Sequence, residues 1–452
     1  MKRALKILSV LVVLLVVAWV ALQVAQRAAP PVSGPIVLPD GSWVRLEAVT
    51  YGTNHLVGPP LSHLAERMPQ SIRSLMVRII GRPAAMRFSA TTSSPKLVLW
   101  LNRGIMATPF PASTGYLECV LSDLSGATSG DKIPYEARYP LETKEFAVFP
   151  RREPEITLSI YYHDSTGAVF KRGSVAFANP LYRRYPEWKP EPLPATKRAG
   201  DVEVTLEKTS TGHGENYEVK RPGGGGQEIS FGTNRLDGGN TTVCVLHLRP
   251  LANSNEVWRV TQVITSDATG NQIGSVKLGG DCEQGFITFS PALWPGEAWK
   301  LNLEILRTEG FTSGELFTFR DVPLGALNTT NRLGWTTNCN GVTVTLEYFL
   351  RRPPPADQNN WSFSEVSQVR LAMPGLTNDL HLNLLSARIR TGPVPNINSW
   401  GGTGTNRPFY FREIPTNATT ADFTFAVQRS RRVEFLVQPE TGVLKLEISG
   451  GR

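Results

Sequence analysis

The sequence predicts an all-β protein: an N-terminal transmembrane helix followed by two or three immunoglobulin-like antiparallel β-sandwich domains. An apolar run near the N-terminus predicts the helix. Nearly every patterned segment beyond residue 36 alternates apolar and polar side chains, which is typical of half-buried strands. The 40 Gly and 34 Pro residues gather in turn-like clusters between these segments and leave little room for long helices.

The N-terminal segment has the pattern of a membrane anchor. Residues 1–6 form a cationic head, and residues 7–25 form an apolar run. At the helical rise, roughly 19 residues span about 28 Å, close to the hydrocarbon thickness of a bilayer. The head is more cationic than the far flank, which favours a cytoplasmic N-terminus. We therefore predict a single-pass membrane protein whose residues 36–452 are extracytoplasmic.

A cleaved signal peptide is the alternative interpretation of this segment. No good cleavage site with small residues at −3 and −1 follows the run, because the nearest ones place Gln23 or Arg27 at −3. The run is also longer than most signal-peptide apolar regions. Length and flanks therefore favour an uncleaved signal anchor over cleavage.

Charge argues against nucleic acid as a partner. The formal net charge is +8, but four of the 47 basic residues precede residue 36, which leaves 43 against 39 acidic residues beyond it. Adjacent arginines are scattered among acidic residues rather than pooled, and we interpret them as solvated surface. These pairs are Arg151–Arg152, Arg183–Arg184, Arg351–Arg352 and Arg431–Arg432.

The strand pattern is clear in several segments. Val202, Val204 and Leu206 fall on one face of a strand whose other face is charged. One segment departs from this period, because the apolar residues of 61–80 recur at helical spacing, with Pro69 as a kink. We expect a short amphipathic helix near 61–80 that packs on its sandwich; docking to a partner or a membrane surface is the alternative. The other alternating sets are Leu301, Leu303 and Ile305; Leu380, Leu382 and Leu384; and Leu444, Leu446 and Ile448.

A weak repeat places the domains. Gly41, Gly200 and Gly341 each begin a turn that leads into a strand with a Val-x-Leu-Glu pattern. The spacings between these turns are those of domains rather than of solenoid repeats. A match to immunoglobulin domains is architectural only, because their Cys-Trp-Cys spacing is missing. We expect a sandwich with a helical insertion over 36–182, a Pro-rich linker over 183–198, and sandwiches over 199–328 and 335–450, the last two separate or packed as one body.

The four cysteines are few for a disulfide-stabilised secreted protein of this length. Cys119 and Cys244 alternate with apolar residues and are expected to be buried. Cys282 and Cys339 lie in turn-like stretches, and a disulfide between them is possible in an oxidising compartment.

No motif predicts catalytic, cofactor-binding or metal-binding residues. The six histidines form no H-E-x-x-H pattern or other zinc spacing, and no G-x-S-x-G elbow, calcium loop or phosphate loop occurs. Three Asp-x-x-Gly segments instead have the pattern of hairpin turns. They are Asp123–Gly126, Asp164–Gly167 and Asp267–Gly270.

The sequence favours a non-enzymatic, membrane-anchored binding or scaffolding protein of the cell envelope, with an envelope protein as its partner. A glycan-binding or adhesion protein is the first alternative, because Trp361 and Trp400 lie in loop-like stretches and sugars stack on exposed aromatic rings. Packing at the end of a core is the competing interpretation of both tryptophans. A hydrolase whose site is assembled from distant residues is the second alternative.

Overall fold

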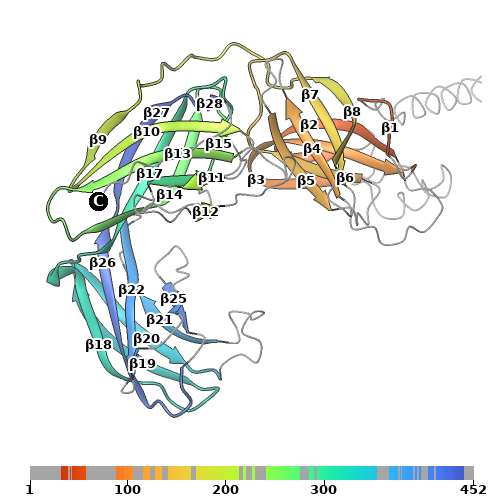
Figure 1. Cartoon of the computed structure of the whole chain (residues 1–452). Helices are drawn as coiled ribbons and strands as arrows, with labels where there is room; N and C mark the ends of the chain where they lie inside the picture. The colour runs from red at the N-terminus through yellow and green to blue at the C-terminus, as the bar shows by residue number, and fades with distance from the viewer. Residues whose placement is uncertain are drawn as a thin grey trace, which may run out of the picture.

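The computed structural model shows a chain of β-sandwiches (Figure 1). Within the described residues it consists of strands β1 to β28 and one 3₁₀ helix, η2 (Ser313–Glu315). Every strand pairing there is antiparallel except that of β10 with β28. The all-β prediction is therefore confirmed. The structure describes residues 32–38, 41, 43–57, 88–104, 116–122, 128–134, 141–163, 169–212, 217–219, 227–229, 241–274, 285–289, 293–353, 366–374, 377, 379–389, 392–393, 397–398, 406–411 and 414–441.

The predicted single-pass membrane location, with residues 36–452 outside the cytoplasm, is corrected by the structure. Among the residues described, no helix is long and apolar enough to cross a membrane. These residues build strands instead, because their apolar side chains recur every second position rather than in a continuous run. The predicted span at residues 7–25 and the predicted helix near 61–80 lie outside the described residues.

The first sandwich has two four-stranded sheets, in the orders β1-β2-β3-β6 and β5-β4-β7-β8. Leu97, Leu99 and Leu101 from one sheet and Leu117, Cys119 and Leu121 from the other are buried in its core. The strands are β1 (Ile36–Val37), β2 (Trp43–Val57), β3 (Phe88–Gly104), β4 (Tyr116–Ser122), β5 (Thr128–Pro134), β6 (Leu141–Phe146), β7 (Glu155–His163) and β8 (Val169–Ala178).

The second sandwich pairs a sheet in the order β16-β13-β10-β28, to which β9 adds on β10, with a sheet in the order β15-β14-β17-β27. Val202, Val204 and Leu206 are buried in its core, as their alternation predicts. A separate two-stranded sheet joins β11 to β12. The strands are β9 (Ala195–Ala199), β10 (Val202–Gly212), β11 (Tyr217–Val219), β12 (Gln227–Ile229), β13 (Thr241–Pro250), β14 (Val257–Asp267), β15 (Gln272–Ile273), β16 (Phe286–Phe289), β17 (Trp299–Glu309), β27 (Arg431–Val437) and β28 (Glu440–Thr441).

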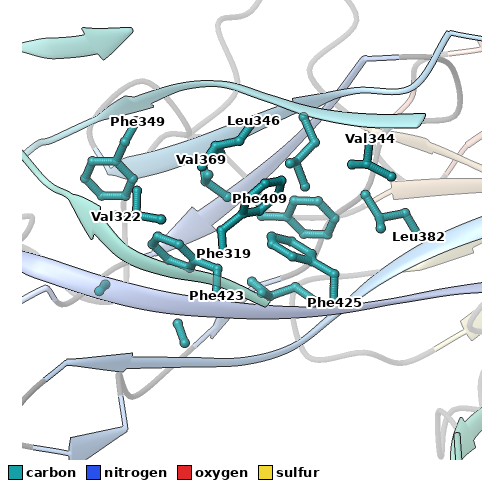
Figure 2. Packing of buried hydrophobic residues seen from close by; sticks show 14 of the residues in the cluster. Phe319, Val322, Val344, Leu346, Phe349, Val369, Leu382, Phe409, Phe423 and Phe425 are labelled. Carbon is teal, nitrogen blue, oxygen red and sulfur yellow. The ribbon is translucent and has the colours of Figure 1, made fainter. Parts of the chain in front are cut away.

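The third sandwich pairs sheets in the orders β18-β26-β22-β23 and β19-β20-β21-β25-β24. Phenylalanines from both sheets fill its core, and Phe349, Phe409, Phe423 and Phe425 lie close together in Figure 2. The strands are β18 (Leu316–Pro323), β19 (Thr330–Cys339), β20 (Val342–Leu350), β21 (Ser367–Ala372), β22 (Leu380–Ile389), β23 (Gly392–Pro393), β24 (Ile397–Asn398), β25 (Asn406–Phe411) and β26 (Thr420–Arg429).

The third sandwich is inserted between two strands of the second. After β26 the chain returns, and β27 pairs along β17 from Trp299 to Ile305. This differs from the expected unit 335–450, which placed the last strands in the third sandwich. Period-two alternation marks which face of a strand is buried but not which sheet the strand joins, so sequence could not reveal the return.

The repeat identified in the sequence marks one structural feature. Gly41, Gly200 and Gly341 all adopt positive φ, a conformation that glycine reaches without strain. They lie in the turns that join β1 to β2, β9 to β10 and β19 to β20. Each of the three sandwiches therefore contains one hairpin whose turn holds such a glycine.

Candidate functional site

Buried polar side chains gather where the sandwiches meet. We define the first joint as the loop 147–154 of the first sandwich, the linker 183–194, and the turn 267–271 with Glu297 of the second sandwich. We define the second joint as the region around Arg307 and the chain crossings at 309–316 and 429–432. Both joints consist of residues far apart in sequence, so no local motif marks them.

Asn271 joins the first sandwich to the second. Its Nδ2 donates to the carbonyl of Phe149 at 3.0 Å, and its Oδ1 accepts from the amide of Phe149 at 3.4 Å. Asn271 itself is held by Asp267, which accepts from the Asn271 amide and from Nδ2. Val148 also inserts into the core of the second sandwich. The loop 147–154 is therefore bound to the second sandwich through the apolar side chain of Val148 and through the backbone hydrogen bonds of Phe149.

The turn at Asp267–Gly270 is confirmed as a turn and packs against Arg151. The Gly270 amide donates to the Asp267 carbonyl at 3.2 Å, and Gly270 has a φ of 91°. Nη1 of Arg151 donates to the carbonyl of Thr269 at 3.1 Å, while its guanidinium lies over the ring of Phe149. A Cβ on Gly270 would lie 3.1 Å from Nη1 of Arg151, so glycine also allows the close approach.

Arg152 connects three parts of the first joint. Its Nε donates to Glu297 Oε1 at 2.6 Å, and its guanidinium also donates to the carbonyls of Tyr185 at 3.1 Å and Pro186 at 2.6 Å. Burial raises the pKa of Glu297, against the lowering effect of the Arg152 hydrogen bond. Arg152 therefore fixes the start of the linker as well as the second sandwich.

The linker then follows the surface of the second sandwich instead of spanning open solvent. Lys300 Nζ lies 5.0 Å from the ring centre of Trp188. The Glu191 amide donates to the carbonyl of Leu436 at 2.7 Å, on the edge strand β27. The stiff Pro-rich segment predicted over 183–198 is therefore extended, and its last residues, from Ala195, belong to strand β9.

Arg307 is the centre of the second joint. Its side chain is 5% exposed and donates to Glu256, also 5% exposed, at 2.8 Å and to both carboxylate oxygens of Glu315. Its backbone amide donates to Oε1 of the buried Gln428 at 3.0 Å, and Nε2 of Gln428 donates back to the Arg307 carbonyl. Two strands of different sandwiches, β17 and β26, are thus joined by a side-chain amide.

A second arginine reinforces this joint at the returning chain. Nε and Nη2 of Arg431 donate to the two oxygens of Asp201 at 2.6 and 3.0 Å, a bidentate geometry. Burial tends to raise the pKa of Asp201, but the hydrogen bonds, that from Arg431 foremost, hold it below its ordinary value. The guanidiniums of both Arg307 and Arg431 lie within 6 Å of the Trp258 ring centre.

Glu304 gathers a further set of partners. Its Oε1 accepts from Ser430 at 2.8 Å and from Nη2 of Arg432 at 3.0 Å, and His381 Nε2 lies 3.4 Å away. Burial opposes ionisation of Glu304, yet the hydrogen bonds from Ser430 and Arg432 lower its pKa. The His381 side chain is 18% exposed and faces Glu304 of the second sandwich.

At both joints, arginine and carboxylate side chains neutralise each other's charge. Glu256, Glu297 and Asp201 each face an arginine, and in the described part of the chain no group of three His, Cys, Asp or Glu side chains could hold a metal ion. A carboxylate whose oxygens already accept hydrogen bonds from an arginine is not available to a second cation or to a reacting group. The joints are therefore suited to fixing the sandwiches in place.

His55 forms a separate polar cluster in the first sandwich. Its Nδ1 lies 2.9 Å from the Thr50 hydroxyl, which also accepts from Trp100 Nε1 at 2.9 Å. The Thr92 hydroxyl lies 3.5 Å from Nε2. A hydroxyl beside an imidazole satisfies part of a nucleophile–base geometry, but His55 is 1% exposed. Thr50 and His55 both lie on β2, and β3 contributes Trp100 and Thr92 to the cluster.

The predicted ligand-binding residues, Trp361 and Trp400, lie outside the described residues, and glycan binding through them stays a prediction. The structure describes seven other tryptophans, and three of them show how their environments differ. Trp294 is buried in the second core, Trp188 lies under Lys300, and Trp335 on β19 is 37% exposed.

The predicted disulfide between Cys282 and Cys339 also stays a prediction, because Cys282 lies outside the described residues. Cys339 is a free, buried thiol whose Sγ donates to the carbonyl of Gly314 at 3.4 Å. Cys119 and Cys244 are buried, as their alternation predicts. Burial raises the pKa of the Cys244 thiol to about 12.

The interpretation of adjacent arginines as solvated surface is wrong for at least three of the eight. Arg151 and Arg351 are each 5% exposed, and Arg431 is paired with Asp201. Arg351 donates to the carbonyls of Gly325, Pro415 and Thr416, so it holds loops of the third sandwich. Arginine can be buried when its donors meet carbonyls and carboxylates in a fixed geometry, which composition alone does not reveal.

Comparison with known proteins adds no family to this picture. No protein-family model matches the chain, and no curated protein is similar enough to count as a relative.

Proposed function

We propose that this protein is a non-enzymatic scaffold that holds three β-sandwiches in a fixed arrangement and presents their outer surfaces to a partner protein. The observation that carries the proposal is the construction of the joints. Val148 of the first sandwich lies in the core of the second, and Gln428 of the third bonds the backbone of Arg307 in the second. Separating the sandwiches would leave these groups unpaired or exposed, which is costly.

The polar groups at the joints support this function over an enzymatic one. Catalysis needs a group whose charge or lone pair is available to a substrate. Arg307, Glu256 and Arg152 are instead occupied by each other or by backbone groups. We also propose that the sandwiches are immunoglobulin-like, because each encloses one core between two sheets whose described strands are antiparallel, apart from the pairing of β10 with β28.

Affinity capture tests this proposal. The full chain serves as bait in an extract of its own cells, and each retained protein is purified and titrated against the chain by calorimetry. A protein that binds in a fixed ratio and is released chemically unchanged is the expected result. A retained molecule that the chain converts into a product would contradict the proposal.

The matched control is a chain with the first joint opened by Arg152→Ala and Asn271→Ala. A scaffold that uses more than one sandwich should lose at least tenfold in affinity for the partner when that joint is opened. A chain with Arg249→Ala changes an exposed ion pair that takes part in neither joint and should bind as the unsubstituted chain does.

A further inference from the structure

The third sandwich exposes one edge of its larger sheet. Strand β19 is ten residues long and, among the strands that the structure describes, pairs with β20 alone. Of its residues, Cys339 alone is buried, and Trp335 is 37% exposed. From Leu333 to Cys339 the strand carries no charged side chain and no proline. It therefore lacks the lysines and prolines with which proteins protect a free edge.

The register shows which backbone groups of this edge are unpaired with β20. Cys339 and Val342 face each other across a two-residue turn in which Asn340 and Gly341 both have positive φ. In such hairpins the pair that flanks the turn is hydrogen-bonded, and bonded and non-bonded pairs then alternate. The amides and carbonyls of Thr337 and Cys339 thus point toward β20. Those of Thr336 and Asn338 point away from it.

We propose that this edge pairs with β19 of a second copy of the chain, antiparallel about a two-fold axis at Thr337. In that register Thr336 faces Asn338 of the second copy, and Asn338 faces Thr336. Each of these pairs exchanges two backbone hydrogen bonds, so all four outward groups of each copy are satisfied. This inference rests on the proposed scaffold function and names the partner at one of its surfaces.

Side chains favour a second copy as the occupant. Pairing of 333–339 with itself brings no like charges face to face, because the segment is uncharged. Thr337 meets its own counterpart in a non-bonded pair, where the side chains are closest and threonine pairs are favourable. Trp335 lies on the same side of the sheet as Leu346, its cross-strand partner, and would be covered by the second copy.

Mutual pairing is tested by the mass of the full chain in sedimentation velocity between about 1 and 200 µM. We expect twice the mass of one chain at the upper concentrations. Thr336→Pro removes one outward donor but no bond to β20, and should raise the dissociation constant at least tenfold. Asn338→Lys places one cation on each side of the two-fold axis. The repulsion between these two cations should also raise the dissociation constant, without restricting the backbone. Thr343→Lys adds the same charge one strand further in, and should leave the dimer unchanged.

A cysteine at the axis tests the register. Cα atoms of a non-bonded antiparallel pair lie about 4.5 Å apart, within the range that a disulfide spans. Thr337→Cys should therefore form a covalent dimer under a mild thiol oxidant, and Thr343→Cys should not. A monomer at every concentration, or a dimer unaffected by both Thr336→Pro and Asn338→Lys, would overturn the proposal. Fixed joints in a monomeric chain would still leave the scaffold function standing.

Discussion

Both joints hold two neighbouring sandwiches together, but the number of chain segments that cross between the sandwiches differs. At the first joint the chain crosses between sandwiches once, and the linker 183–194 needs Arg152, Lys300 and Leu436 to hold it against the second sandwich. At the second joint the chain crosses twice, because the third sandwich is inserted between β17 and β27. A double crossing removes most rotational freedom by connectivity alone, whereas a single crossing depends on side-chain contacts.

The difference extends to electrostatics. The first joint relies mainly on hydrogen bonds to backbone carbonyls, with one ion pair between Arg152 and Glu297. The second joint buries Arg307 between two carboxylates and adds the Arg431–Asp201 pair. Breaking a buried ion pair leaves an uncompensated charge, so single substitutions should be more harmful at the second joint.

The largest expected effect comes from ending the chain after Ser430. This removes β27 and β28, and with them Val433, Phe435 and Val437 from the second core. Loss of a buried phenylalanine alone costs about 3–5 kcal/mol, and a whole domain has about 5–15 kcal/mol of stability. We expect the second sandwich to lose its cooperative unfolding transition in calorimetry.

A chain that ends after Thr441 keeps both strands and is the control for this truncation. If the shorter chain still showed the unfolding transition of the second sandwich, the return of the chain would not be needed to close that core.

Arg307→Ala should have the next largest effect. Glu256 and Glu315 would lose their shared cation, and Glu256 is 5% exposed, so the free energy of unfolding should fall by about 3–5 kcal/mol. Urea unfolding measures the change. Arg249→Ala, whose side chain is 67% exposed, should change stability by at most about 1 kcal/mol. Equal effects of the two substitutions would argue against a buried network at the second joint.

Asn271→Ala weakens the first joint more modestly. The amide and carbonyl of Phe149 would lose their partners, at a cost of about 1–3 kcal/mol. Hydrogen exchange of the loop 147–154 should accelerate, because its opening no longer breaks these bonds. Asn253→Ala, in an exposed turn, should leave that exchange unchanged. Protection of the loop that survives Asn271→Ala would show that Val148 alone holds it.

The smallest expected effect is a difference in the sign of pH dependence between the joints. The pKa of Asp201 is lowered in the folded state, so its stabilisation is present above about pH 3.9, its ordinary pKa, and is lost as pH falls through the folded value. The pKa of Glu297 is raised by burial, so its ionisation opposes folding as pH rises above about 4.3.

Substitution at each group should reveal these opposite signs. Between pH 3 and 6, Asp201→Asn should reduce the rise of unfolding free energy with pH, and Glu297→Gln should increase it. Urea unfolding at several pH values measures both slopes. Changes of the same sign would show that Glu297 is stabilised as an anion by Arg152.

The sequence predicted what depends on local alternation. The buried faces of β10, β17 and β22 follow from residues two apart, and the turn at Asp267–Gly270 follows from residues three apart. The positive φ of Gly41, Gly200 and Gly341 explains the repeat that was visible in the sequence. Local sequence is sufficient in these cases because the interacting residues are neighbours along the chain.

The joints could not be predicted because their contacts are far apart in sequence. Arg431 and Asp201 form an ion pair although they are 230 residues apart in sequence. Asn271 hydrogen-bonds a loop of the first sandwich that is 122 residues away in sequence. Arginine, asparagine and glutamate are usually solvated, so composition favours the exposed interpretation. The one available signal was Asp267–Gly270, a turn whose Thr269 and Asn271 could have suggested a polar contact.

Distances across both joints show whether the three sandwiches are held in one fixed arrangement. Spin labels on exposed positions of the three sandwiches, Ala176, Ser254 and Asn417, are introduced as cysteines into a chain whose native cysteines are replaced by alanine. Pulsed electron paramagnetic resonance then measures the distance distribution for each pair. We expect narrow distributions for both joints, with Arg152→Ala and Asn271→Ala together widening the distribution across the first joint alone. Broad distributions across either joint of the chain with intact joints would contradict a fixed scaffold.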